Sequence, residues 1–183
     1  MKKKILLSML ILAGIVSSCK ETPNEVKTEN TVEKYKDPNL EKLEVEASRL
    51  RAGGSVKSVE LTKDIAKICY VKDYSEYKKI NPDSGLSEED LKSYWESGDA
   101  IQKALVDGSV KIMKKLDYIN EVEIILPYQG KTYSIIVSKN KLEKFIGSDF
   151  KSINEDWDNK FSNPYVYNDS GRKKFFAKFG KVE

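Results

Sequence analysis

Histidine is entirely absent from this chain of 183 residues. Imidazole is therefore excluded as a catalytic base, a proton shuttle or a metal ligand, and Ser-His-Asp and Cys-His catalysis are excluded with it. Only two cysteines are present, so the usual thiolate and imidazole ligands of a zinc site are too few. We expect no cofactor and no metal.

Two further binding motifs are missing. The acidic segment 154–159 lacks the glycine and the glutamate that a calcium-binding EF-hand loop needs at its sixth and twelfth positions. The glycine pair Gly53-Gly54 precedes a predicted strand, whereas a phosphate-binding loop follows a strand and opens a helix. The sequence therefore gives no support to calcium or nucleotide binding.

Long hydrophobic runs are also scarce. Hydrophobic residues make up 39% of the chain and charged residues 33%, which indicates that part of the chain is not packed in a core. The longest apolar run, Ile5 to Val16, is shorter than the stretch of about 20 residues that spans a bilayer. It follows three lysines at positions 2–4, and this order is typical of a secretion signal.

The four residues that follow this run carry a resemblance. Val16-Ser17-Ser18-Cys19 resembles the lipobox of bacterial lipoprotein precursors, in which an aliphatic residue and two small residues precede a cysteine. The resemblance implies that residues 1–18 are a signal peptide, and that Cys19 is lipidated and becomes the mature N-terminus. Acyl chains anchor a protein with about 0.8 kcal/mol for each buried CH₂ group. The expected first partner is therefore a membrane, reached through the lipid on Cys19.

The expected location follows from the same residues. The residue after Cys19 is Lys20 and not an aspartate. This resembles the pattern that releases lipoproteins to the outer membrane of many Gram-negative cells. We expect a lipid-anchored protein of the bacterial cell envelope, in the outer membrane if the cell is Gram-negative. Cleavage would remove three lysines and no acidic residue, leaving 29 basic and 29 acidic residues. A neutral mature chain gives no reason to expect nucleic-acid binding.

Two segments are predicted to remain once residues 1–18 are cleaved. Residues 19–38 are rich in Lys, Glu, Thr and Asn without apolar periodicity, so we interpret them as the lipidated cysteine and a flexible tether. Residues 39–183 are predicted to form a single α+β domain, and they resemble no family. Strand-like segments occur in pairs, at 56–61 with 65–71 and within 121–138. Paired strands predict an antiparallel sheet of about four strands in two hairpins, with helices packed on it.

Helical periodicity predicts the remaining elements. Short helices are expected within 39–54 and at 73–80, and a longer helical segment is expected at 87–116, where Asp107-Gly108-Ser109 would kink or break it. Extra C-terminal helices are expected near 140–146, 149–163 and 170–179, with Asn163-Pro164 ending the second. Cys69 lies in an apolar strand segment and is interpreted as a small buried hydrophobic residue.

A candidate binding surface comes from the aromatic residues. Trp157, Tyr165 and Tyr167 lie within eleven residues, and both tyrosines belong to a predicted loop at 163–170. Exposed aromatic side chains often bind glycan rings or protein partners. Packing in the core is the alternative interpretation of these three residues.

Three functions remain open at this point. The first is a non-enzymatic binding or envelope-assembly domain, whose partner is an envelope protein or glycan. The second is a carboxylate-based hydrolase of envelope glycans, which would need two carboxylates about 5–10 Å apart in a cleft. The third is an immunity or inhibitor lipoprotein that occludes a partner protein, which would need a large exposed apolar patch. The lack of any nucleophile paired with a base favours binding over catalysis.

Overall fold

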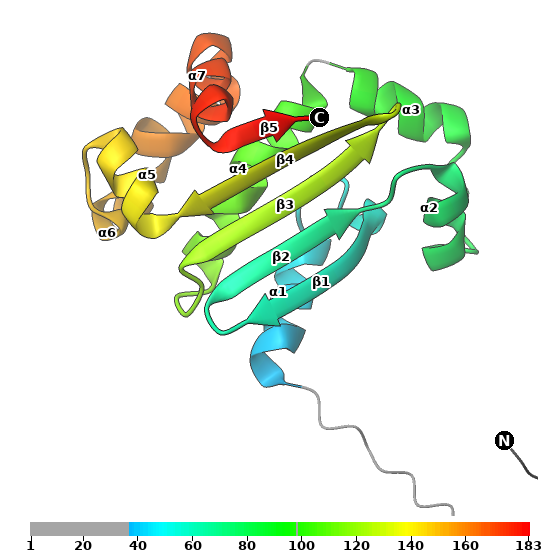
Figure 1. The fold of residues 1–183 in the computed structure, drawn as a ribbon, viewed down its shortest axis with the longest axis horizontal. Coiled ribbons are helices and arrows are strands. Elements are labelled where there is room, and N and C mark those ends of the chain that lie inside the picture. The colour runs from blue at the N-terminus through cyan, green and yellow to red at the C-terminus, as the bar shows by residue number, and fades with distance from the viewer. Residues whose placement is uncertain (1–36, 98) are drawn as a thin grey trace, which may run out of the picture. The chain divides into compact units, whose positions relative to one another are not determined.

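The computed structural model describes residues 37–97 and 99–183 (Figure 1). The predicted signal peptide, Cys19 and residues 19–36 of the predicted tether lie outside the described residues. The fold begins with helix α1 (Pro38–Ser48), whose N-terminus is capped by the Asp37 carboxylate accepting from the Asn39 N–H at 2.9 Å.

The chain has an α+β fold built on a five-stranded sheet with the strands in sequence order. Strands β1 (Val56–Thr62) and β2 (Ile65–Tyr70) form one antiparallel hairpin. Strands β3 (Glu121–Tyr128) and β4 (Lys131–Ser138) form the second, closed by Gln129 and Gly130, which both have positive φ. Positive φ at both turn positions is the geometry that a two-residue hairpin loop favours.

The prediction of a purely antiparallel sheet of about four strands was wrong in two respects. Strands β2 and β3 pair in parallel, with Ile68 opposite Ile124. A fifth strand, β5 (Gly180–Val182), pairs antiparallel with β4 at the edge of the sheet. A parallel pair needs a crossover of a dozen or more residues, and the segment between β2 and β3 provides it as three helices.

The crossover consists of α2 (Tyr74–Ile80), α3 (Glu88–Glu96) and α4 (Ala100–Lys115). Both short helices begin at the predicted caps. The Asp73 carboxylate accepts from the Glu76 N–H at 2.8 Å, and Ser87 and Asp90 form the reciprocal capping box of α3. Helix α4 then carries the chain back across the sheet, since its 16 residues rise about 24 Å.

The break in this helical segment lies earlier than the sequence predicted. The chain turns between α3 and α4, where Asp99 adopts a φ of 58°, and α4 continues unbroken through Asp107-Gly108-Ser109. Gly108 is retained inside the helix because the sheet lies very close to it. A Cβ atom added there would lie 3.0 Å from Ile124 Cδ1 and 3.5 Å from Leu50 Cδ1.

Helices cover only one face of the sheet. Helices α1 and α4 lie behind the strands in Figure 1, and the strand residues that face them, such as Ile68, Val122 and Ile124, are buried. The opposite face carries polar and half-buried side chains, including the Lys67–Glu123 ion pair at 3.3 Å. Cys69 belongs to this uncovered face and is half-buried, so its interpretation as a buried hydrophobic residue was wrong.

The C-terminal quarter is helical but divided differently from the prediction. It contains α5 (Lys139–Ile146), α6 (Phe150–Glu155), the π-helix η2 (Asp158–Tyr167) and α7 (Asp169–Phe179). Pro164 does not end the helix there, because hydrogen bonds in η2 reach back five residues, as from Asn168 N–H to Asn163 O at 3.0 Å. The predicted loop at 163–170 is therefore the end of η2 and the start of α7.

A buried arginine fastens these helices to the crossover. The side chain of Arg172 in α7 is 3% exposed, and its Nη2 lies 2.7 Å from both Asp99 Oδ2 and Asp169 Oδ1. Its Nη1 donates to the Val166 carbonyl at 2.7 Å. Because Asp99 immediately precedes α4, this contact joins the end of η2, the start of α7 and the start of α4.

Replacing Gly108 with leucine tests the close contact between α4 and the sheet. Gly108→Leu should destabilise the fold by about 1–3 kcal/mol, since even a Cβ atom meets Ile124 and the remaining carbons have no space. Chemical denaturation of the full chain would measure this change. Gly85→Leu is the matched control because nothing lies within 4 Å of its added Cβ. Equal stability of the two variants would contradict this packing.

Candidate functional site

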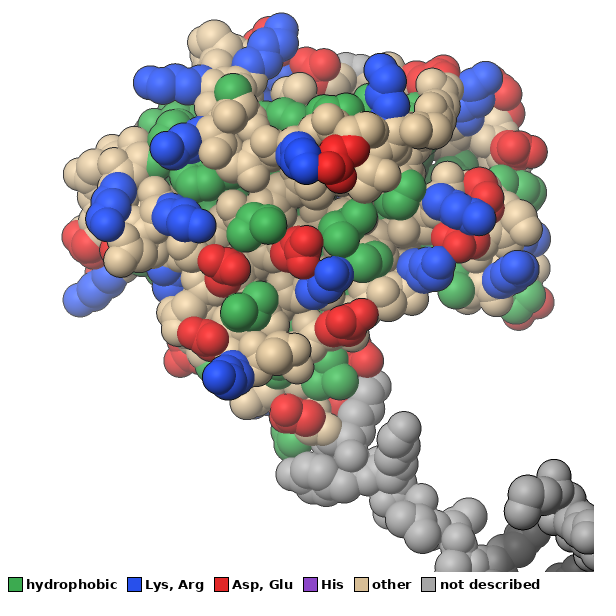
Figure 2. Space-filling model, in the orientation of Figure 1, with side chains coloured by type: hydrophobic (Ala, Val, Ile, Leu, Met, Phe, Trp, Pro, Cys, Tyr) green, Lys and Arg blue, Asp and Glu red, His purple; other side chains and the backbone are tan. Residues whose placement is uncertain are grey.

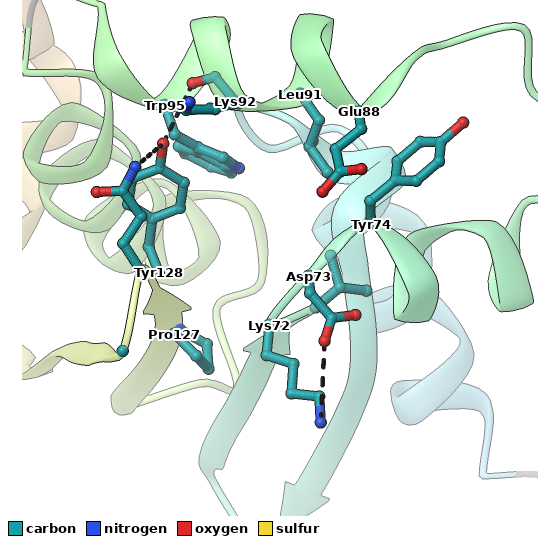
Figure 3. Close-up of a pocket in the computed structure, with 12 residues that line it drawn as sticks. Lys72, Asp73, Tyr74, Glu88, Leu91, Lys92, Trp95, Pro127 and Tyr128 are labelled. Atoms are coloured by element: carbon teal, nitrogen blue, oxygen red, sulfur yellow. Dashed lines mark hydrogen bonds and ion pairs between the residues drawn. The ribbon is translucent and has the colours of Figure 1, made fainter.

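The parallel strand pair creates a cleft at one end of the sheet. The chain leaves β2 through Val71–Tyr74 and leaves β3 through the turn at Gln129-Gly130, and helix α3 lies over both (Figures 1 and 3). The space enclosed is about 460 Å³. In open sheets with parallel strands, ligands bind in crevices beyond the carboxyl ends of the strands, which is the position of this cleft.

Aromatic and apolar side chains form the walls. We call this site the aromatic cleft, and its apolar lining comprises Val71, Tyr74, Leu91, Trp95, Pro127 and Tyr128. The Trp95 indole is buried and held by edge-on contacts with Tyr70 at 5.7 Å and Tyr94 at 4.9 Å between ring centroids. The Tyr74 hydroxyl donates to the Leu86 carbonyl at 3.0 Å, which fixes this ring beside α3. The walls are therefore positioned without a ligand.

Charged and amide groups surround these walls. The polar lining comprises Lys72, Asp73, Glu88, Lys92 and Gln129. Figure 3 shows the carboxylates of Asp73 and Glu88 on the same side of the cleft, one from the loop after β2 and the other from the first turn of α3. Lys72 Nζ lies 3.9 Å from Asp73 Oδ2. The cleft thus offers hydrogen-bond donors and acceptors of both charges around an apolar centre.

Tyr128 is the aromatic residue that joins the two sides of the cleft. Its hydroxyl lies 3.2 Å from Glu96 Oε1 and donates to the Lys92 carbonyl at 3.4 Å, and Gln129 Nε2 donates to the same Glu96 oxygen at 2.8 Å. Burial raises the pKa of the Tyr128 hydroxyl, and the negative charge of Glu96 raises it further. These contacts link the β3–β4 hairpin to α3.

The three aromatic residues predicted as a binding surface lie elsewhere, and not all on one surface. Tyr165 packs between Phe145 and Phe175, with ring centroids 5.3 and 5.8 Å away. Trp157 and Tyr167 both line a second depression of about 490 Å³, formed by α1, α4 and η2. We call it the basic groove, and besides these two aromatic residues it is lined by Arg49, Arg51, Lys111, Lys114 and Lys115.

Sequence reasoning missed the aromatic cleft entirely. Its residues come from three separate segments, 71–74, 88–95 and 127–130, which only the parallel pairing of β2 with β3 brings together. One signal was available in the sequence. The connection between the two predicted hairpins contains enough helical residues for a parallel crossover, which would have placed the ends of both strands at one edge.

Within residues 37–97 and 99–183, no group of three or more Cys, Asp or Glu side chains is placed to hold a metal ion. In the same residues no helix is long and apolar enough to cross a membrane. No protein family, no curated protein and no solved structure matches this chain. The candidate sites are therefore the aromatic cleft and the basic groove, two of the depressions on the described surface.

Glu96→Gln tests the electrostatic link between the hairpin and α3. The variant removes a negative charge beside Tyr128, so the pKa of the tyrosine hydroxyl should fall, while remaining above its ordinary value because burial persists. Titration of ¹³C-labelled tyrosine by NMR would measure it. The pKa of Tyr118, whose hydroxyl donates to the Asn39 carbonyl, should stay unchanged. An unchanged or higher Tyr128 pKa would contradict the contact.

Proposed function

We propose that this chain is a lipoprotein of the bacterial envelope, anchored through Cys19, whose domain binds an envelope glycan in the aromatic cleft without catalysing a reaction. The observation that carries the proposal is the composition of the cleft. Tyr74 and Tyr128 supply aromatic surface beside the buried Trp95 ring, and five charged or amide side chains surround it. The lipobox-like residues at 16–19 supply the cellular context.

Carbohydrates match this combination of groups. A sugar ring presents an apolar C–H face that packs on aromatic rings, and hydroxyls that both donate and accept hydrogen bonds. Lys72 and Lys92 can donate, while Asp73 and Glu88 accept. The volume of about 460 Å³ lies in the range of small-ligand pockets. A glycan ligand therefore uses the apolar walls and the polar rim together.

The anchor would place the domain near such glycans. Fully extended, residues 19–37 reach at most about 60 Å from the lipidated cysteine. The domain would then sample the surface next to its membrane, where the local concentration of envelope polymers is high. Binding at modest affinity suffices for a tethered protein of this kind.

The hydrolase alternative has one observation in its favour, because Asp73 and Glu88 share a cleft. A glycosidase acid is kept protonated by an apolar pocket that excludes water. The Asp73 side chain is instead 49% exposed, and its Oδ1 already accepts from the Glu76 N–H as a helix cap. Glu88 is also exposed. Binding accounts for both carboxylates without requiring a buried acid.

The occluding inhibitor has less support. It requires a large exposed apolar patch, whereas Figure 2 shows apolar side chains interspersed with acidic and basic ones over the uncovered face of the sheet. The large apolar side chains that are exposed in the described residues come from different parts of the fold. Val45, Ile65 and Ile136, for example, belong to α1, β2 and β4. The aromatic cleft is a better-defined binding site than this face.

Tyr128→Ala tests glycan binding. The full-length lipidated protein in detergent should co-sediment with cell-wall sacculi, or be retained by envelope polysaccharide extracted from the same cells. Tyr128→Ala should weaken that binding by about tenfold or more, equivalent to about 1.4 kcal/mol, because an aromatic wall is lost. Tyr118→Ala is the matched control, since Tyr118 is also half-buried with its hydroxyl donating to a backbone carbonyl.

Three results would contradict the proposal. The first is binding to neither glycan, and the second is equal binding by Tyr128→Ala and the wild-type protein. The third is release of new reducing ends from sacculi by the wild-type protein but not by Glu88→Gln, which would establish the hydrolase instead. Thermal unfolding of both tyrosine variants distinguishes loss of the cleft from loss of the fold.

A further inference from the structure

The basic groove concentrates positive charge on a domain that has little net charge. Arg49 and Arg51 follow α1, and Lys111, Lys114 and Lys115 lie on the last two turns of α4. Only two acidic residues, Asp107 and Asp158, line the same groove. A concave surface with one predominant sign of charge focuses the electrostatic potential and attracts ions of the opposite sign.

The two acidic residues offset the lysines only in part, because Asp158 raises the pKa of Lys114 by less than burial and Lys115 lower it. Asp107 is engaged by Arg51, whose Nε lies 3.3 Å from Asp107 Oδ2. Among the residues that the structure describes, no carboxylate lies within 4.0 Å of Lys111, Lys114 or Lys115. These three ammonium groups are therefore available to an anionic ligand.

Lys114 is held in place by an aromatic ring. Its Nζ lies 4.1 Å from the centre of the Trp157 ring, and Phe161 packs on Trp157 with centroids 4.6 Å apart. Burial lowers the pKa of Lys114, and repulsion from Lys115 lowers it further. An anion placed between these lysines would relieve that repulsion, so the arrangement favours a bound negative charge.

The opposite wall positions a guanidinium group. Arg51 Nη2 donates to the Tyr167 hydroxyl at 3.4 Å, and the Tyr167 ring lies 5.9 Å from the guanidinium carbon. Tyr167 is 61% exposed, which leaves its ring accessible at the edge of the groove. A planar arginine fork beside point-charged lysines is the combination that proteins use for phosphate.

A helix C-terminus alone does not account for this arrangement. The negative end of the α4 dipole favours cations in the last turn, which explains Lys114 and Lys115. It does not explain Lys111 one turn earlier, Arg51 of a different segment, or the aromatic support of Lys114. Arg49 already has a partner in Glu46, whose Oε1 lies 2.6 Å from its Nη1. The convergence of cations from two elements on one depression indicates a ligand site.

We propose that the basic groove binds a phosphate ester, with the phosphate between Arg51 and the lysines of α4. Two sources carry this chemistry, namely the phosphodiester headgroup of a membrane lipid and a soluble phosphate ester. The site is separate from the aromatic cleft, and the soluble source does not depend on lipid anchoring. Trp157 and Tyr167, which the sequence marked as binding residues, then act by holding Lys114 and Arg51.

Lysine acetylation read by mass spectrometry tests the site residue by residue. The full-length protein in neutral detergent is treated with an acetylating reagent, with or without glycerol 3-phosphate, at constant ionic strength. Glycerol 3-phosphate at about ten times its Kd should slow acetylation of Lys111, Lys114 and Lys115 by about tenfold. Lys174 and Lys178, exposed lysines on α7, should react at unchanged rates.

Two matched double charge reversals distinguish phosphate binding in the basic groove from a general effect of the net charge of the protein. Lys111→Glu with Lys115→Glu should abolish the protection of Lys114. Lys174→Glu with Lys178→Glu reverses two lysines at the same spacing on another exposed helix face and should leave the protection intact. Protection that survives the first pair, or that sodium chloride at the same ionic strength reproduces, would overturn the proposal.

Lipid nanodiscs distinguish the two sources. Protection of the three lysines in nanodiscs containing phosphatidylglycerol, compared with phosphatidylcholine alone, would identify the headgroup of an anionic phospholipid as the ligand, because phosphatidylcholine carries a phosphodiester without net negative charge. Protection by glycerol 3-phosphate without any effect of phosphatidylglycerol would identify a soluble phosphate ester. Absence of protection in both experiments would show that the groove is not a phosphate site, and would leave the glycan proposal unaffected.

Discussion

The burial of helix α4 against the sheet is the constraint on which the rest of the structure depends. Helices α1, α3 and α7, the π-helix η2, and strands β3 and β4 all pack on this helix. Most of its residues are buried, and Gly108 allows a close approach to Ile124, since an added Cβ atom would lie 3.0 Å from Ile124 Cδ1. The helix also returns the chain across the sheet, so the parallel pairing of β2 with β3 exists only because α4 lies where it does. Arg172 reinforces this position by binding Asp99 at the start of α4.

Both candidate sites are consequences of that arrangement. The aromatic cleft lies where the parallel strands end, under α3, which leads directly into α4. The basic groove lies along the second half of α4, where Lys111, Lys114 and Lys115 face cations that follow α1. One helix thus helps to place an aromatic site of mixed polarity and, separately, a cationic one. The two depressions therefore differ in chemistry, and the ligands proposed for them differ accordingly.

The sequence predicted the local structure well and the long-range pairing poorly. Both hairpins, the caps at Asp73 and Ser87, and the first helix follow from local chemistry and are confirmed. The parallel pair was missed because a hairpin pattern predicts only the pairing of strands that follow each other directly in the chain, whereas three helices separate β2 from β3. The break near Asp99 was misplaced because the burial of Gly108 has no local signature. Pro164 was taken as a helix end, although a π-helix accommodates it. Of the three aromatic residues singled out, Tyr165 packs among phenylalanines, and the aromatic cleft was not foreseen at all.

Anchoring through Cys19 is the proposal on which a glycan or lipid ligand depends, because it determines which envelope components the domain meets. Metabolic labelling of cells with an alkyne fatty acid, followed by mass spectrometry of the mature N-terminus, tests it most directly. The account predicts a labelled protein in the membrane fraction that begins at Cys19, and loss of both label and cleavage in Cys19→Ala. An unlabelled wild-type protein that retains residues 1–18 would contradict it.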